Sequence, residues 1–187
     1  MSDKPFKSNY TFWLSILTIV IILIITAATI AGCATHPSET VATTPQTGNK
    51  IGDLAPDFSL PTIDNKMMSL HEYMGKNIIL NFWATWCGPC VYEVPFLREI
   101  DERWSKAGVM VIAINTQDSI EAATSYARHN NLNFVIPFDP RGGVASLYNV
   151  RGLPTSFFID SEGVIKSIKV GPFISTSEIE ERMKSFK

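Results

Sequence analysis

A pair of cysteines at the junction between an apolar strand and a helix constrains the fold of this chain more than any other feature. The largely apolar run Ile78–Phe82 is typical of a strand buried on both faces. A helical pattern of apolar residues begins at Cys87 and continues to about Lys106. Two cysteines separated by two residues, Cys87 and Cys90, can close a small disulfide when they open a helix. The sequence therefore predicts a disulfide-forming pair where a central strand meets a helix.

The position of each cysteine in this helix predicts its role. Cys87 lies at the first turn, where backbone N–H groups lack partners within the helix. Those groups and the helix dipole stabilise a thiolate. Cys90 lies one turn further in and is expected to be more buried, and Pro89 fits the first turn because its missing N–H costs nothing there. We therefore predict that Cys87 attacks a disulfide and that Cys90 resolves the mixed disulfide.

A metal site and a purely structural disulfide are the other uses of such a pair. A tetrahedral zinc site needs four ligands, usually including a second cysteine pair or a histidine pair. The third cysteine stands alone, and the histidines are far apart: Cys33, His36, His71 and His129. A loop this small removes little chain entropy, so a structural disulfide would stabilise only weakly. The sequence favours a redox pair and predicts no metal.

The chain from Ile51 to Lys187 is predicted to form one α/β domain. Strands and helices alternate around the cysteine pair and end in a hairpin and a terminal helix, which predicts a central mixed β-sheet covered by helices. Beyond the strand and helix of the pair, the predicted elements are strands at 58–60, 67–70, 109–115 and 134–138, helices at 120–127 and 143–149, a hairpin of 155–159 and 164–170, and a helix from Ser175 or Thr176.

An apolar segment near the N-terminus is predicted to hold this domain at a membrane. Thr11–Ala31 carries no charge and is long enough to cross a bilayer, which takes about 20 apolar residues. Lys4 and Lys7 precede it, so its N-terminal end is expected in the cytoplasm and the domain outside. A buried core helix is the alternative, but the run has no polar face.

Two kinds of membrane tether fit residues 1–33. The segment ends in Ile30–Cys33, which resembles the lipobox of bacterial lipoproteins, where the signal is cleaved before a cysteine that is then lipidated. The apolar stretch exceeds the roughly 7–15 residues usual in a signal-peptide core, so an uncleaved signal anchor is the alternative. Residues 34–50 are rich in Thr, Pro, Ser and Gly and are predicted to form a flexible linker.

The segment Asn81–Cys90, NFWATWCGPC, resembles the active-site segment of the thioredoxin superfamily. More narrowly, the chain resembles the membrane-anchored TlpA/ResA-like branch of thiol–disulfide oxidoreductases, with a redoxin or AhpC/TSA-like domain. Four further segments match that branch in order: 55–60, Glu93 with Pro95, 148–155 and 160–163. The resemblance covers the chain from about Ile51 and implies a thioredoxin-like fold with an N-terminal β-hairpin extension.

The resemblance also implies roles for single residues. Pro154 would follow a cis peptide bond beside the two sulfurs, and the backbone of Leu153 would pair with an extended substrate segment. Glu93 would lie near the buried cysteine with a raised pKa and would exchange protons with Cys90. A trans proline and a solvated glutamate are the alternatives. The expected site residues are catalytic Cys87, Cys90 and Glu93 and substrate-binding Trp86, Gly88, Pro89, Leu153 and Pro154, while Trp83 is either core or site.

The dipeptide Gly88–Pro89 favours the reducing direction, because thioredoxin carries the same pair and is a reductant at about −270 mV. The resemblance implies a tethered protein outside the cytoplasm, in the periplasm or on the outer face of the cytoplasmic membrane. Its clients would be disulfides in exported proteins, with apocytochrome c as the leading candidate. Electrons would come from a CcdA/DsbD-like membrane donor, and no cofactor beyond the Cys87–Cys90 disulfide is expected. The net charge of −2 indicates no nucleic-acid partner.

Two other functions remain open. A thiol peroxidase shares the segment 55–60, but peroxiredoxins place Thr or Ser three residues before a lone peroxidatic cysteine, and Ala84 occupies that position here. A non-enzymatic copper-binding module of related fold would use a wider cysteine spacing and a histidine. Neither feature is present around Cys87.

Overall fold

The computed structural model describes residues 13, 14, 16–22 and 45–186 of the chain. The chain divides into two compact units, Met1–Thr43 and Thr44–Lys187. In the first unit, residues 13, 14 and 16–22 are helical, and their side chains are exposed. Within the described part of the chain, no helix combines the length and the apolar character that a membrane crossing requires. The remainder of the predicted apolar span, and Cys33, lie outside the described residues.

A five-stranded mixed sheet forms the centre of the second unit, with the strand order β5-β4-β3-β6-β7. The central strand β3 pairs in parallel with β4 and antiparallel with β6. The edge strands differ in direction, because β5 is parallel to β4 and β7 is antiparallel to β6. The strands span Asn77–Trp83 (β3), Val109–Thr116 (β4), Phe138–Asp139 (β5), Thr155–Ile159 (β6) and Ile165–Val170 (β7). The predicted mixed sheet is confirmed.

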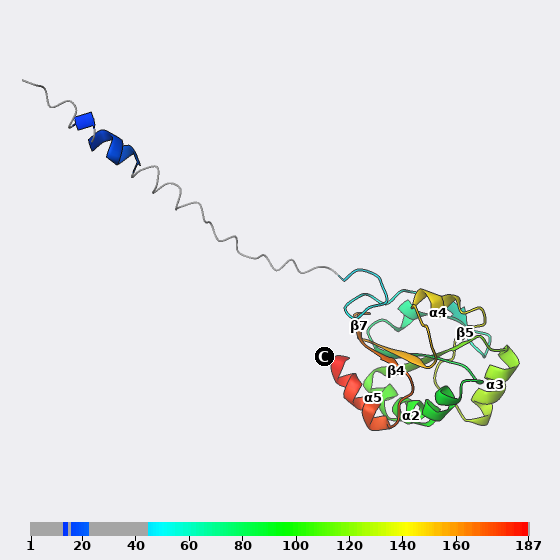
Figure 1. Cartoon of the computed structure of the whole chain (residues 1–187). Helices are drawn as coiled ribbons and strands as arrows, with labels where there is room; N and C mark the ends of the chain where they lie inside the picture. The colour runs from blue at the N-terminus through cyan, green and yellow to red at the C-terminus, as the bar shows by residue number, and fades with distance from the viewer. Residues whose placement is uncertain (1–12, 15, 23–44, 187) are drawn as a thin grey trace, which may run out of the picture. The chain divides into compact units, whose positions relative to one another are not determined.

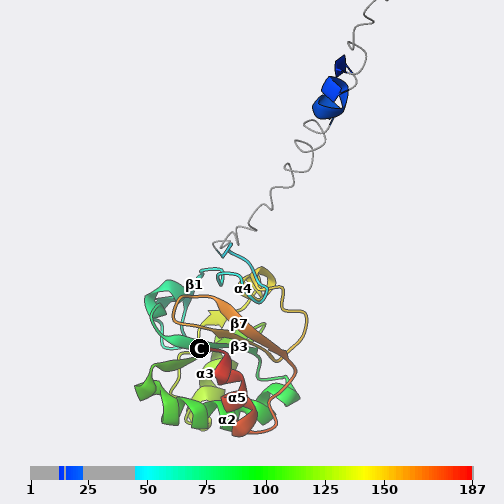
Figure 2. The ribbon, with the colours of Figure 1, turned by 90° about the vertical axis from the view of Figure 1, so that its left-hand side faces the viewer.

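Helices cover both faces of this sheet, as Figures 1 and 2 show. The helices α2, α3 and α5 lie on one face, and α4 lies on the other together with a small antiparallel hairpin of β1 and β2. The bounds are Ser59–Pro61 (β1), Met67–Ser69 (β2), Gly88–Trp104 (α2), Ile120–His129 (α3), Gly143–Leu147 (α4) and Thr176–Met183 (α5), with 3₁₀ helices at Leu70–Tyr73 (η1), Ser105–Ala107 (η2) and Lys184–Phe186 (η3). This is the predicted thioredoxin-like α/β arrangement with its hairpin extension.

The predicted strand at 134–138 is wrong for most of its length. Only Phe138 belongs to β5, and Val135 makes an isolated bridge to Ile112 of β4. Pro137 has no backbone N–H and therefore cannot donate to a continuous ladder. The segment instead connects the hairpin to the sheet, since Ile63 N donates to Ile136 O at 3.0 Å.

The last residues of the predicted linker are hydrogen-bonded to the start of the domain. Leu54 N donates to the carbonyl of Gln46, and Gly48 N donates to the carbonyl of Leu54, both at 2.9 Å. These bonds place residues 46–50 beside the entry to the hairpin.

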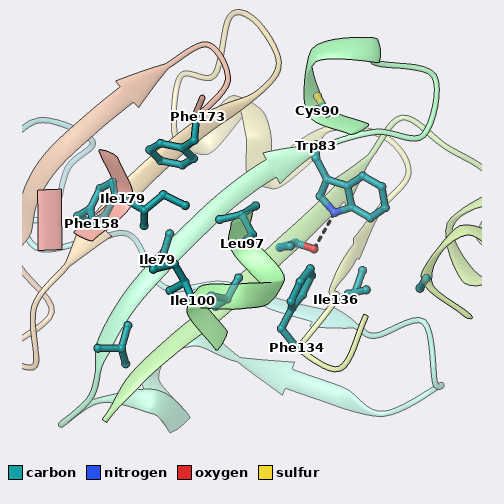
Figure 3. Packing of buried hydrophobic residues seen from close by; sticks show 14 of the residues in the cluster. Ile79, Trp83, Cys90, Leu97, Ile100, Phe134, Ile136, Phe158, Phe173 and Ile179 are labelled. Atoms are coloured by element: carbon teal, nitrogen blue, oxygen red, sulfur yellow. Dashed lines mark hydrogen bonds between the residues drawn. The ribbon is translucent and has the colours of Figure 1, made fainter. Parts of the chain in front are cut away.

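Two apolar clusters, one on each face of the sheet, form the core. One contains Ile79, Trp83 and Leu97 and joins α2 and α5 to the sheet (Figure 3). Within it, the indole nitrogen of Trp83 donates to the carbonyl of Ala113 at 3.1 Å. Trp83 is 2 % exposed, so of its two predicted positions the structure favours the core. The other cluster packs Tyr148 of the α4 end against Phe82 and Phe157.

Candidate active site

The cysteine pair lies at the start of α2, where the sequence predicts it. Cys87 is the N-cap of the helix, and its Sγ accepts a hydrogen bond from Cys90 N at 3.2 Å. Pro89 occupies the first turn. The two sulfurs form a disulfide with Cα atoms 5.2 Å apart. Strand β3 ends four residues earlier, so the core of the sheet fixes the position of the pair.

The two cysteine residues differ in exposure. Cys87 is 6 % exposed, whereas Cys90 is completely buried. A sulfur at the helix N-terminus is also the one that unpaired N–H groups can stabilise as a thiolate. This arrangement suits an attacking role for Cys87 and a resolving role for Cys90, and both roles stay predictions.

A cleft of about 540 Å³ opens directly beside Cys87. One wall consists of the helix start, and the opposite wall belongs to the loop that precedes β6. The predicted site residues in this cleft are Trp86, Cys87, Gly88, Pro89 and Leu153. Trp86 is 61 % exposed, so the cleft has an aromatic side chain open to solvent.

The loop before β6 carries the cis peptide bond that the resemblance implies. Leu153–Pro154 is cis, and Pro154 O accepts a hydrogen bond from Gly171 N at 2.9 Å. Pro154 is buried, while Leu153 is half-buried and lines the cleft. The structure therefore brings Leu153 to the same cleft as Cys87.

Glu93 lies one turn after Cys90 on α2 and is 1 % exposed, so the alternative of a solvated glutamate is wrong. Its Oε1 accepts from Asn81 Nδ2, and its Oε2 accepts from Phe173 N, both at 2.8 Å. Asn81 Nδ2 also donates to Ser156 Oγ at 2.9 Å. The carboxyl group therefore belongs to a polar network inside the otherwise apolar face between β3 and α2.

Burial raises the pKa of Glu93 to about 7. The hydrogen bonds from Phe173 and Asn81 and the positive charge of Lys169 lower this pKa, while the negative charge of Glu178 raises it. Burial is the largest of these effects because a charged carboxylate loses most of its hydration there. A group with this pKa can bind and release a proton at neutral pH.

A second loop, which follows β4, holds the segment before Cys87 in place. The carboxylate of Asp118 accepts from Thr85 N at 2.7 Å and from Thr85 Oγ1 at 2.9 Å. It also accepts from Asn115 Nδ2 at 2.9 Å. In addition, Trp86 Nε1 donates to Gln117 O at 3.1 Å. Gln117, whose carbonyl accepts this bond from the Trp86 indole, has a left-handed backbone with a φ of 58°. Such a conformation is uncommon for a residue other than glycine.

Thr85, Asn115, Gln117 and Asp118 are not among the site residues that the sequence predicts. Asn115 lies at the carboxyl end of the parallel strand β4 and Asp118 follows that strand, and the carboxyl ends of parallel strands meet at one sheet edge. That rule could have placed them beside Thr85, at the end of the neighbouring strand. The contacts of Asn81 with Ser156 and Glu93 carry no comparable signal, because they join polar groups of separate buried elements.

Comparisons with known proteins show which family and fold this chain shares. The model of the AhpC/TSA family matches residues 51–168. The thiol-disulfide oxidoreductase ResA of Geobacillus kaustophilus is 36 % identical over 144 residues, which are 77 % of this chain and 82 % of the relative.

Two solved structures show the same fold. One is a thiol:disulfide interchange protein DsbE candidate from Chlorobium tepidum, with a TM-score of 0.67 and 30 % identity, covering 77 % of this chain and 100 % of that one. The other is the exposed lipoprotein thioredoxin Etrx1 of Streptococcus pneumoniae, with a TM-score of 0.61 and 29 % identity, covering 69 % of this chain and 98 % of that one.

Proposed function

The chain belongs to the AhpC/TSA family and is a thiol–disulfide oxidoreductase, and we propose that it reduces disulfides of exported proteins from a membrane tether. The observation that carries the proposal is the asymmetry of the pair. Cys87 opens a helix, lines the cleft of about 540 Å³ and is 6 % exposed, whereas Cys90 lies one turn behind it and is fully buried.

The proposed reaction begins when the thiolate of Cys87 attacks one sulfur of a client disulfide. A mixed disulfide forms, and the second client sulfur leaves as a thiolate. The sulfur of Cys90 then attacks Cys87, which releases the first client sulfur and forms the Cys87–Cys90 disulfide. The client disulfide gains the two electrons that the cysteine pair loses. Because Cys87 starts as a thiolate, the pair itself releases only the proton of Cys90, and the two client thiolates take up their protons from the surrounding water.

Glu93 is proposed as the group that takes the proton from Cys90. Cys90 is buried and has to lose its proton in order to attack, so a nearby base is needed inside the protein. The carboxyl of Glu93 lies one turn away with a pKa of about 7. It can therefore accept this proton and later return it when the pair is reduced again.

The reducing direction and the place of action rest on the sequence. Gly88–Pro89 is the dipeptide of thioredoxin. The uncharged run Thr11–Ala31, preceded by two lysines, would tether the domain outside the cytoplasm, either as a signal anchor or through lipidated Cys33. The relative from Streptococcus pneumoniae is an exposed lipoprotein, which supports this placement. Apocytochrome c is the proposed client, and a CcdA/DsbD-like membrane protein is the proposed electron donor.

Redox titration of the full-length protein against thiol–disulfide buffers tests the direction. We expect a potential near that of thioredoxin, about −270 mV, which would make the protein a reductant outside the cytoplasm. A potential near that of the oxidant DsbA, about −120 mV, would contradict the proposal.

Mass spectrometry of the membrane-extracted protein tests the type of tether. An intact N-terminal peptide that contains Lys4 and Lys7 would exclude the lipoprotein form. A lipid-modified peptide that begins at Cys33 would exclude the uncleaved anchor.

A further inference from the structure

A groove lies next to the cleft of Cys87, and one short segment of chain, which we call the ridge, separates the two hollows. The ridge is the segment Val150–Gly152, whose three residues line both the cleft and a groove of about 380 Å³. The groove continues over the end of α4 and the outer part of the sheet, where it is lined by Tyr148, Phe157, Ile168 and Val170. The two hollows are therefore adjacent and are separated by one short segment of chain.

The groove is mainly apolar and open to solvent. Val170, at the end of the edge strand β7, is 71 % exposed, although an apolar side chain gains free energy when it leaves water. Ile168 is half-buried beside it. An apolar side chain of a partner could cover this open surface.

The ridge itself carries one positive charge. Arg151 is exposed and is the single charged side chain among the residues that line either hollow. Its Nε donates to Asn149 Oδ1 at 3.2 Å, and in the described part of the chain its guanidinium forms no ion pair. The two terminal nitrogens of a guanidinium match the two oxygens of a carboxylate.

We propose that the groove is a second client subsite and that it selects extended segments which carry an acidic and an apolar residue close to the attacked cysteine. This inference rests on the proposed function of the cysteine cleft. With the client cysteine beside Cys87, the next few residues cross the ridge, because an extended chain advances about 3.3 Å per residue. The acidic residue then meets Arg151, and the apolar residue enters the groove beside Val170.

Synthetic peptides with an internal Cys-x-x-Cys disulfide test this subsite on the reduced full-length protein. One peptide carries Glu and Leu beside the cysteines, a second carries Gln and Leu, and a third carries Glu and Ser. Each pair is placed before the cysteines in one set and after them in another. The second-order rate constants are compared with the rate for hydroxyethyl disulfide, an uncharged small disulfide that reports the dithiol itself.

We expect the Glu–Leu peptide of one set to react about two- to fivefold faster than the peptide with Gln, as for a solvent-exposed ion pair. Arg151→Gln should abolish this preference, while Arg128→Gln, an exposed arginine on α3, should retain it. The preference for Leu over Ser should be about fivefold. It should disappear in Val170→Glu and persist in Ile51→Glu, a residue 64 % exposed that lines neither hollow.

Equal rates for all peptides, relative to hydroxyethyl disulfide, would overturn the subsite and leave the proposed function intact. Failure to reduce hydroxyethyl disulfide would instead contradict the proposed function. If Val170→Glu changed the oligomeric state but no peptide rate, a second copy of this chain would be the occupant, which would also overturn the inference.

Discussion

The substitution Glu93→Gln is expected to change how stability depends on pH. In the unfolded chain this glutamate loses its proton near 4.5, whereas in the folded oxidised protein it does so at a pKa of about 7. Between these values the folded state holds a proton that the unfolded state lacks. Stability must therefore fall as pH rises through this interval and become constant, for this group, above pH 7.

The size of the effect follows from the same two values. At about 1.4 kcal/mol per pKa unit, ionisation of Glu93 costs about 3 kcal/mol of folding free energy between pH 4.5 and 7. Glutamine has the same shape and does not ionise, so Glu93→Gln should remove this loss. Its amide can keep the bond from Phe173 N, and the unpartnered Asn81 Oδ1 can accept from the new NH₂ group once the Asn81 side chain turns over.

Urea unfolding of the oxidised full-length protein, followed by tryptophan fluorescence between pH 4.5 and 8, measures the difference. Glu181→Gln removes a carboxylate from the surface of α5 and serves as the control. We expect the wild type and the control to lose about 3 kcal/mol more than Glu93→Gln over this range. Parallel curves for all three proteins would show that Glu93 ionises normally, and the proposed proton transfer would lose its basis.

Two further perturbations test the loops around the pair. Asp118→Ala leaves three hydrogen-bond donors of Thr85 and Asn115 without their acceptor. We expect this substitution to lower the free energy of unfolding by about 2 kcal/mol. Asp118→Asn keeps one carbonyl oxygen and should lower it by less. Urea titrations measure both variants, and a loss below about 0.5 kcal/mol in Asp118→Ala would contradict the hydrogen-bonded role of this carboxylate. Trp86→Ala removes the exposed aromatic surface of the cleft, so reduction of insulin should slow about fivefold while hydroxyethyl disulfide reacts as before. Unchanged insulin reduction would exclude Trp86 from client docking.

The part of the fold that the sequence predicts well is the part that depends on local pattern. The strand of Ile78–Phe82 and the helix after Cys87 follow from an apolar run and from apolar residues at helical spacing. The burial of Glu93, one turn after Cys90, is predicted by the family resemblance. For the strand and the helix, neighbouring residues determine the structure.

The course of the segment 134–138 and the hydrogen bonds of Asp118 and Glu93 depend on contacts between distant segments, and the sequence does not predict them. The apolar run 134–138 reads as a strand, but Pro137 and the pairing with the hairpin prevent a continuous ladder. Asp118 reaches Thr85 across 33 positions, and Glu93 accepts from Phe173 N across 80. No sequence periodicity links residues so far apart in the chain. The polar network of Glu93 and the contacts of Asp118 can be identified only once the order of the strands in the sheet is known.

Trapping of the mixed disulfide distinguishes the attacking cysteine from the resolving one. The reduced full-length variant Cys90→Ser is mixed with a client disulfide and the products are separated under non-reducing conditions. We predict a covalent adduct through Cys87 that reductant removes, and no comparable adduct with Cys87→Ser. If Cys87→Ser traps the client as well as Cys90→Ser does, the assignment of Cys87 as attacking residue and Cys90 as resolving residue is wrong.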